Sequence, residues 1–230
     1  MTQVDPNSLW FQTVDTFSLC RGGGNGPNHP SQLYAILKYC GEEKMSFLDY
    51  GSGSGTTYEA MKNCIFIKGI HERLIDYFIY RGMDIIPKNV EWCKQTFPEA
   101  DFKVNSKIHE IDELDTSWDV VYSRHVVDHM ESFEKAMDEM KRVSKNLIIT
   151  VFWVPMSSGD EHEIKNIVDA PGTDREKLYP NEYTNSYSRK KVMEYLNNDP
   201  SWELLELAEE IGKHDWIIVL KRKFAFLNLI

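Results

Sequence analysis

The sequence predicts an α/β fold with a mostly parallel sheet, helices on both faces and an antiparallel hairpin at one edge. Short apolar or β-branched runs alternate with segments of helical periodicity along residues 45–154, which is typical of a parallel sheet covered by helices. The last two apolar runs lie too close together for a helical crossover, so they predict a hairpin. A chain of 230 residues can form one domain of this kind, and we expect a single domain over 1–230.

The elements follow in order along the chain. The expected strands are 45–50, 80–86, 101–104, 118–122, 147–154, 202–208 and 216–222. Helices are expected after a cap at Ser31, from Thr56, and over 87–96 and 133–143. Residues 1–44 contain a loop rich in glycine and proline, and we expect them to form an N-terminal cap or lid. The polar stretch that begins at 156 is too long for an ordinary connection, so we expect a substrate-side insertion over 156–200.

Composition argues against several classes of protein. No apolar run approaches the roughly 20 residues that cross a bilayer, and the N-terminus lacks the pattern of a secretory signal. The four cysteines are scattered, which predicts reduced thiols and a cytoplasmic location. The histidines form no recognised ligand pattern, so we expect no metal. A net charge of −10 disfavours nucleic acid as a partner.

A glycine-rich turn, Asp49-Tyr-Gly-Ser-Gly-Ser-Gly55, follows the first strand directly. In an open α/β sheet ligands bind beyond the carboxyl ends of the strands, and glycines let the backbone approach them closely. The dinucleotide fingerprint would need glycine at Thr56, and a phosphate-binding loop would need a lysine that is missing here. The turn therefore favours a nucleoside-type ligand without a pyrophosphate, and a plain tight loop is the alternative.

Asp84 ends the second strand. A carboxylate at this position can accept hydrogen bonds from both hydroxyls of a ribose, or it can cap the helix that follows. The separation from Gly51, 84 − 51 = 33 residues, exceeds the roughly 20 residues expected for such an acid. Residues 63–79 should therefore contain additional structure.

Three segments carry a resemblance to a known family: LDYGSGSGT, GMDI and WDVVYSRHVVDHM. In this order they resemble the successive motifs of class I S-adenosylmethionine-dependent methyltransferases, over residues 45–155 and the terminal hairpin. The resemblance implies a Rossmann-like sheet of seven strands, S-adenosyl-L-methionine as cofactor, and transfer of its methyl group to an acceptor.

The resemblance also implies which residues meet the cofactor. The residues placed against its methionine part are Asp49, Gly51, Ser52, Gly53, Gly55 and Thr56. Asp84 would hold the ribose, and Ile85 would pack on the adenine. The family often places an acid after the third strand to receive the adenine amino group. Asn105 or Ser106 stands there instead, and either can accept that bond through a side-chain oxygen.

The end of the fourth strand should face the methyl group, so Ser123 and Arg124 are further expected cofactor contacts. His125 and His129 are the candidate proton acceptors, because histidine titrates near neutral pH. If this segment is helical, their i, i+4 spacing places them on one face; the alternative role is hydrogen bonding that fixes the loop. Arg21 is the expected partner of the cofactor's carboxylate, unless its loop is simply solvated.

The expected activity is methyl transfer to an oxygen, nitrogen or carbon nucleophile of a small-molecule acceptor. The acceptor would be met by the N-terminal segment and the 156–200 insertion, with no membrane involved and the oligomeric state left open. The segment SRHVVDH lacks the motif of DNA base methyltransferases. Two alternatives remain: a protein that binds S-adenosylmethionine without transferring its methyl group, and a nicotinamide-dependent oxidoreductase.

Overall fold

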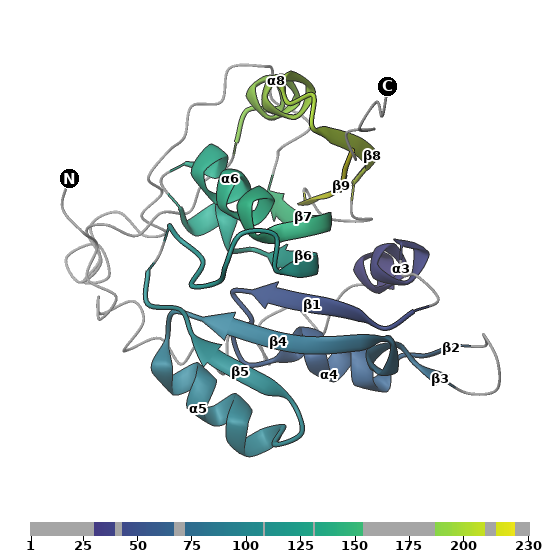
Figure 1. Cartoon of the computed structure of the whole chain (residues 1–230), viewed down its shortest axis with the longest axis vertical. Coiled ribbons are helices and arrows are strands. Elements are labelled where there is room, and N and C mark those ends of the chain that lie inside the picture. Colours follow the sequence, from purple (N-terminus) through teal and green to yellow (C-terminus); the bar gives the residue numbers. More distant parts are fainter. Residues whose placement is uncertain are drawn as a thin grey trace, which may run out of the picture.

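The computed structural model describes residues 30–39, 43–66, 72–107, 109–130, 132–153, 187–209 and 215–223. A seven-stranded sheet with the order β5-β4-β1-β6-β7-β9-β8 forms its centre (Figure 1). The strands are β1 (Met45–Tyr50), β4 (Phe78–Asp84), β5 (Asp101–Val104), β6 (Trp118–Arg124), β7 (Ser144–Trp153), β8 (Trp202–Glu209) and β9 (Asp215–Arg222). The helices are α3 (Pro30–Tyr39), α4 (Thr56–Asn63), α5 (Pro87–Thr96), α6 (Phe133–Val143) and α8 (Arg189–Asn198), with 3-10 turns η1 (Leu74–Tyr77) and η2 (Val127–His129).

The strand pairing confirms the predicted fold class. β1 lies between β4 and β6 and is parallel to both, and β5 and β7 extend the parallel part on either side. β9 pairs antiparallel with β7 and with β8, so the last strand of the chain lies between β7 and the edge strand β8. The carboxyl ends of the parallel strands meet at one edge of the sheet, where the glycine turn and Asp84 lie.

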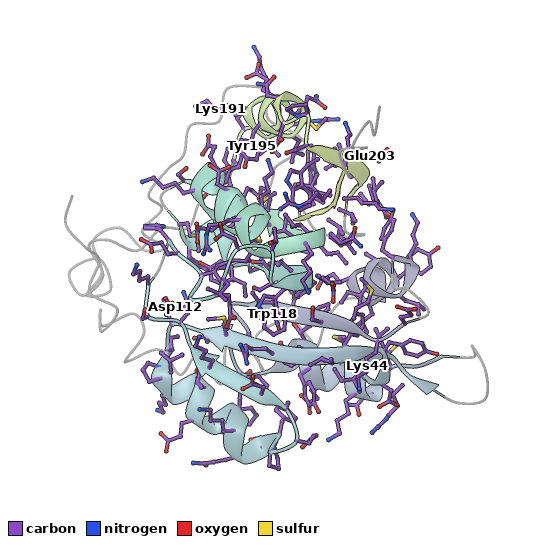
Figure 2. All side chains as sticks on the ribbon, in the orientation of Figure 1. Lys44, Asp112, Trp118, Lys191, Tyr195 and Glu203 are labelled. Carbon is purple, nitrogen blue, oxygen red and sulfur yellow. The ribbon has the colours of Figure 1, made fainter. Side chains whose placement is uncertain are left out.

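Alternating side chains along the central strands divide the core into two layers. Phe47 faces α3, α4 and α5, whereas its neighbour Leu48 faces α6 and α8. On the first face Phe47 packs against the ring of Tyr80 with centroids 5.8 Å apart. On the second face Tyr195 of α8 lies against α6, where its hydroxyl donates to Asp138 and Lys141 lies over its ring (Figure 2). Helices thus cover both faces, as predicted.

Several bounds differ from the prediction for local reasons. β4 begins and ends two residues before the expected 80–86, because Ile86 already precedes the helix. Pro87 holds Ile86 in an extended conformation, so Ile85 and Ile86 resemble a continuation of the strand when only the sequence is known. Ser31 was expected to cap the first helix, but α3 begins at Pro30, whose fixed φ suits a first helical position. β6 extends two residues further than expected, to Arg124.

Regular structure also lies in the extra segment over 63–79 and in the expected 156–200 insertion. The extra structure expected over 63–79 is a short antiparallel pair, β2 (Ile65–Phe66) with β3 (Glu72–Arg73), followed by η1. Figure 1 shows this pair at the end of the sheet opposite the carboxyl ends of β1 and β4. In the expected 156–200 insertion, α8 was not predicted; Ser188 accepts a hydrogen bond from Lys191 N–H at its start. Residues 1–29 and 154–186 lie outside the described part of the chain.

Candidate active site

The glycine turn after β1 is folded tightly against its neighbours. Gly51, Gly53 and Gly55 have φ values of 79°, 53° and 76°, which other residues rarely adopt. The N–H groups of Gly51 and Ser52 both donate to the Met83 carbonyl, at 2.8 and 2.9 Å. A Cβ at Gly51 would lie 1.9 Å from Cγ2 of Val126. The turn needs glycine there for two independent reasons, backbone conformation and space.

Asp84 at the end of β4 is joined to this turn. Its Oδ2 accepts from Gly53 N–H at 2.8 Å, and its Oδ1 accepts from Ile86 N–H at 2.9 Å and from the Asn89 amide at 3.3 Å. Burial raises the pKa of Asp84, although the hydrogen bonds from Ile86, Gly53 and Asn89 oppose the shift. Each carboxylate oxygen has two lone pairs, so these contacts leave Oδ2 able to accept one further hydrogen bond, for example from a hydroxyl group. Ile85 beside it is partly buried.

Asp49 is the second carboxylate of the site and is 1% exposed. Burial raises its pKa to about 7, whereas hydrogen bonds from Tyr80 and Thr57 and the charge of Arg124 lower it. The Tyr80 hydroxyl donates to Asp49 Oδ2 at 2.6 Å. Near neutral pH this carboxyl is therefore balanced between its two protonation states, and a nearby positive charge favours the ionised form.

Asn105 and Ser106 follow β5, but their polar groups are engaged within the loop. The Asn105 amide donates to the carbonyls of Lys107 and Glu110, and its Oδ1 accepts from Asp112 N–H at 3.0 Å. Ser106 N–H donates to Asp112 Oδ2 at 2.6 Å. Burial opposes the ionisation of Asp112, but its bonds with Ser106 and the nearby lysines hold its pKa below the ordinary value. Figure 2 shows Asp112 at the carboxyl-end edge of the sheet.

The end of β6 brings Ser123, Arg124 and His125 to the same edge. Ser123 is fully buried, and among the described residues its hydroxyl has no hydrogen-bond partner; the same holds for Thr150, its neighbour in register on β7. Nε and Nη2 of Arg124 are also buried without a partner in this part of the chain. His125 has a φ of 51°, and its Nδ1 lies 2.9 Å from Asp128 Oδ2.

The expectation that His125 and His129 share one helical face is wrong. The left-handed conformation of His125 ends β6, and the helical turn spans Val127–His129 alone. His129 N–H donates to the Val126 carbonyl at 3.0 Å, as in a 3-10 turn. His125 is instead fixed from both ends, by Asp128 at its ring and by the Val151 carbonyl at its N–H.

The structure brings most of the expected residues to one edge of the sheet. The exception is Arg21, which lies outside the described residues. Sequence reasoning missed the partners that orient the site: Tyr80, Asn89, Asp112 and Asp128. Tyr80 pairs with Phe47 and so shares the face of Asp49, but this relation depends on the strand register, for which the sequence offered no signal.

The described residues contain neither a side-chain cluster that could hold a metal nor a helix that could cross a membrane. Across these residues no three His, Cys, Asp or Glu side chains gather as a metal site would require. None of the helices placed by the structure has the length and apolar character to cross a membrane. The described residues at the carboxyl edge supply two buried carboxylates, an arginine, a histidine in contact with Asp128 and the backbone of the glycine turn.

Comparison with known proteins agrees with this geometry. Residues 48–147 match the family model of a methyltransferase domain. A SAM-dependent methyltransferase from Aquifex aeolicus is similar in structure, with a TM-score of 0.57, 17% identity, and coverage of 96% of this chain and 100% of that one. The magnesium protoporphyrin IX methyltransferase of Synechocystis PCC 6803, solved with bound SAH, has a TM-score of 0.57 and 14% identity, covering 84% and 81%.

A third similar structure is the putative methyltransferase of Haloferax volcanii in complex with the Trm112 methyltransferase activator. It has a TM-score of 0.61 and 13% identity, with coverage of 94% of this chain and 97% of that one. No curated protein matches the chain at a significant level of sequence similarity. At these identities the structural likeness establishes the fold, and the match over 48–147 shows that this part of the chain is similar to a methyltransferase domain.

Proposed function

We propose that this chain, whose residues 48–147 match a methyltransferase domain, is a class I S-adenosylmethionine-dependent methyltransferase that methylates a small-molecule acceptor. The nucleophile is an oxygen, nitrogen or carbon atom. The observation that carries the proposal is the hydrogen bond from Gly53 N–H to Asp84. This bond joins the glycine turn, which can approach a ligand closely, to a carboxylate positioned to bind a ribose.

Different residues at the carboxyl edge of the sheet fit the ribose, the adenine and the methionine part of the cofactor. Asp84 holds a ribose hydroxyl with the remaining lone pair of Oδ2, and Ile85 packs on the adenine. Asp49 and the turn from Gly51 to Thr56 meet the methionine part, where Gly51 and Gly53 are partly exposed and carry no side chain. When bound, S-adenosylmethionine supplies a methyl group on a sulfonium, ready for in-line displacement.

The adenine end of the site is formed by the loop after β5. Asn105 shapes this loop through its bonds to Lys107, Glu110 and Asp112, so its side-chain oxygen is already shared. Ser106 keeps its side chain exposed beside Asp112. We include Asp112 in the proposed adenine site, because a carboxylate is the stronger acceptor for an amino group.

His125 is the proposed proton acceptor for the nucleophile, and Ser123 lies two residues before it on β6. Asp128 contacts the His125 ring through Nδ1, and we propose Nε2 as the atom that accepts the proton. His129 is a second candidate, on the following 3-10 turn.

The two histidines can be separated by substitution. His125→Asn suits the left-handed backbone, since asparagine tolerates positive φ. It should lower the turnover number about 100-fold or more while leaving affinity for S-adenosylhomocysteine within about 2-fold of wild type. His129→Asn serves as the matched control. Equal losses in both variants, or unchanged turnover in His125→Asn, would remove His125 from the proposed mechanism.

The acceptor is proposed to be small because the acidic chain disfavours nucleic acid. We propose that residues 1–44 and 156–200 meet it within a single domain over 1–230, in the cytoplasm. The test uses methyl-labelled S-adenosylmethionine with a cell extract separated by size. We expect label in the low-mass fraction; label in protein or RNA would refute a small acceptor. Binding of the cofactor without label anywhere would favour the non-catalytic alternative.

A further inference from the structure

Arg124 stands at the point where the glycine turn meets β6. It follows Ser123, which pairs in register with Tyr50, so Arg124 is level with Gly51. Alternation along β6 places Tyr122 and Arg124 on one face of the sheet, and Tyr122 pairs with Asp49. Arg124 and Asp49 therefore lie on the same face at the same edge, and the charge of Arg124 acts on Asp49.

The Arg124 guanidinium has buried N–H groups for which the described residues supply no acceptor. Its Nε and Nη2 atoms are buried and have no hydrogen-bond partner in the part of the chain the structure covers. Leaving buried donors of a charged group without acceptors is costly, so proteins rarely keep such an arrangement without a ligand. A guanidinium presents parallel N–H groups that match the two oxygens of a carboxylate.

Asp49 supplies the complementary half. Its carboxylate lies on the face shared with Arg124, and its side chain accepts from Tyr80 at 2.6 Å, which fixes its direction. An acid and an arginine side by side match the ammonium and carboxylate of an α-amino acid. The glycine turn follows Asp49 directly, and Gly51 and Gly53 are partly exposed and carry no side chain.

We propose that Arg124 binds the carboxylate of the cofactor's amino-acid part and makes the site selective for a ligand that carries this carboxylate. The inference rests on the proposed function and adds a specificity-determining residue to it. Arg124 on β6 thereby takes the role that the sequence suggested for Arg21. Arg124 belongs to strand β6, so its backbone is held in the sheet before any ligand arrives.

The test compares two ligands that differ by the carboxylate: S-adenosylmethionine and its decarboxylated form, which keeps the ammonium group. Calorimetric titration of the wild-type chain should give about 10- to 100-fold tighter binding of S-adenosylmethionine. Arg124→Gln should remove this preference by weakening S-adenosylmethionine binding to the same extent, with the decarboxylated ligand within about 2-fold of wild type. Any indirect effect through Asp49 acts on the shared ammonium, so it cancels in the ratio.

Two variants control the experiment. Arg124→Lys keeps the charge without the fork of N–H groups, should retain part of the preference, and carries the test if the glutamine variant does not fold. Arg73→Gln removes an exposed arginine that pairs with Asp76 near the far hairpin, and should change neither affinity. An undiminished preference in both Arg124 variants overturns the inference, as does equal weakening of both ligands. A wild-type chain that binds neither ligand refutes the proposed function itself.

Discussion

Replacing Asp49 with asparagine should make the protein more stable at alkaline pH and weaken its hold on the cofactor. Asp49 is buried, and its pKa rises from 3.8 to about 7 in the folded chain because burial disfavours the charge. A carboxyl with a higher pKa in the folded state holds its proton longer there than in the unfolded chain. Its ionisation therefore costs folding free energy progressively as the pH rises from about 4 to about 7.

The magnitude follows from those two pKa values. Between pH 5 and pH 8, the free energy of unfolding of the wild type should fall by about 2.5 kcal/mol relative to Asp49→Asn. Other titrating groups, including Asp84, are present in both proteins and cancel to first order in this difference. The neighbours that set the value are Tyr80 and Thr57, which bond to the carboxyl, and the charges of Asp84 and Arg124.

Urea denaturation of both proteins at pH 5, 6, 7 and 8 measures this difference directly. The gap between the two unfolding free energies should open in favour of Asp49→Asn as the pH rises. Tyr80→Phe provides a control, since removing its bond to Asp49 should move the pKa of Asp49 further upward and shift the transition to higher pH. A gap that stays constant from pH 5 to pH 8 would refute the reasoning.

Three further predictions concern the same edge. Asp84→Asn should weaken binding of S-adenosylhomocysteine at least about 10-fold, measured by calorimetry, and lower the free energy of unfolding by about 1–3 kcal/mol, measured by urea denaturation. The reason is that the N–H group of either Gly53 or Ile86 loses its acceptor. Gly51→Ala should cost more than about 2 kcal/mol in urea denaturation, because φ is 79° and the Cβ meets Val126; Val126→Ala should restore part of it. Affinity for S-adenosylhomocysteine should fall about tenfold per pH unit below 7, as Asp49 becomes protonated; a flat profile from pH 5 to 7 would exclude Asp49 as the ammonium partner.

Most of the scaffold could be predicted because its signals are local. α5 begins at the proline the sequence offers, and α6 is strongly amphipathic with Ser132 as its cap. α8 escaped prediction because the part of it that is fully buried is small, Val192 and Leu196, within a polar segment. The N-terminal cap or lid and the substrate-side insertion stay predictions over residues 1–29 and 154–186, which lie outside the described part of the chain.

The site was predictable in its members and less so in its contacts. The glycine turn and Asp84 are motifs whose backbone requirements show directly in the sequence. The left-handed conformation of His125 left no such trace, and it invalidated a spacing argument that assumed a helix. The pairing of Asp49 with Tyr80 depends on strand register, which a single sequence does not give.

Ligand-induced stabilisation of the wild-type chain tests the central claim most directly. S-adenosylhomocysteine at about 100 times its dissociation constant should stabilise the fold by about 2.7 kcal/mol, which corresponds to roughly 5–10 °C in Tm for a domain of this size. NAD should give no shift, and Asp84→Asn should reduce the shift with S-adenosylhomocysteine. Stabilisation by NAD without stabilisation by S-adenosylhomocysteine would contradict the account.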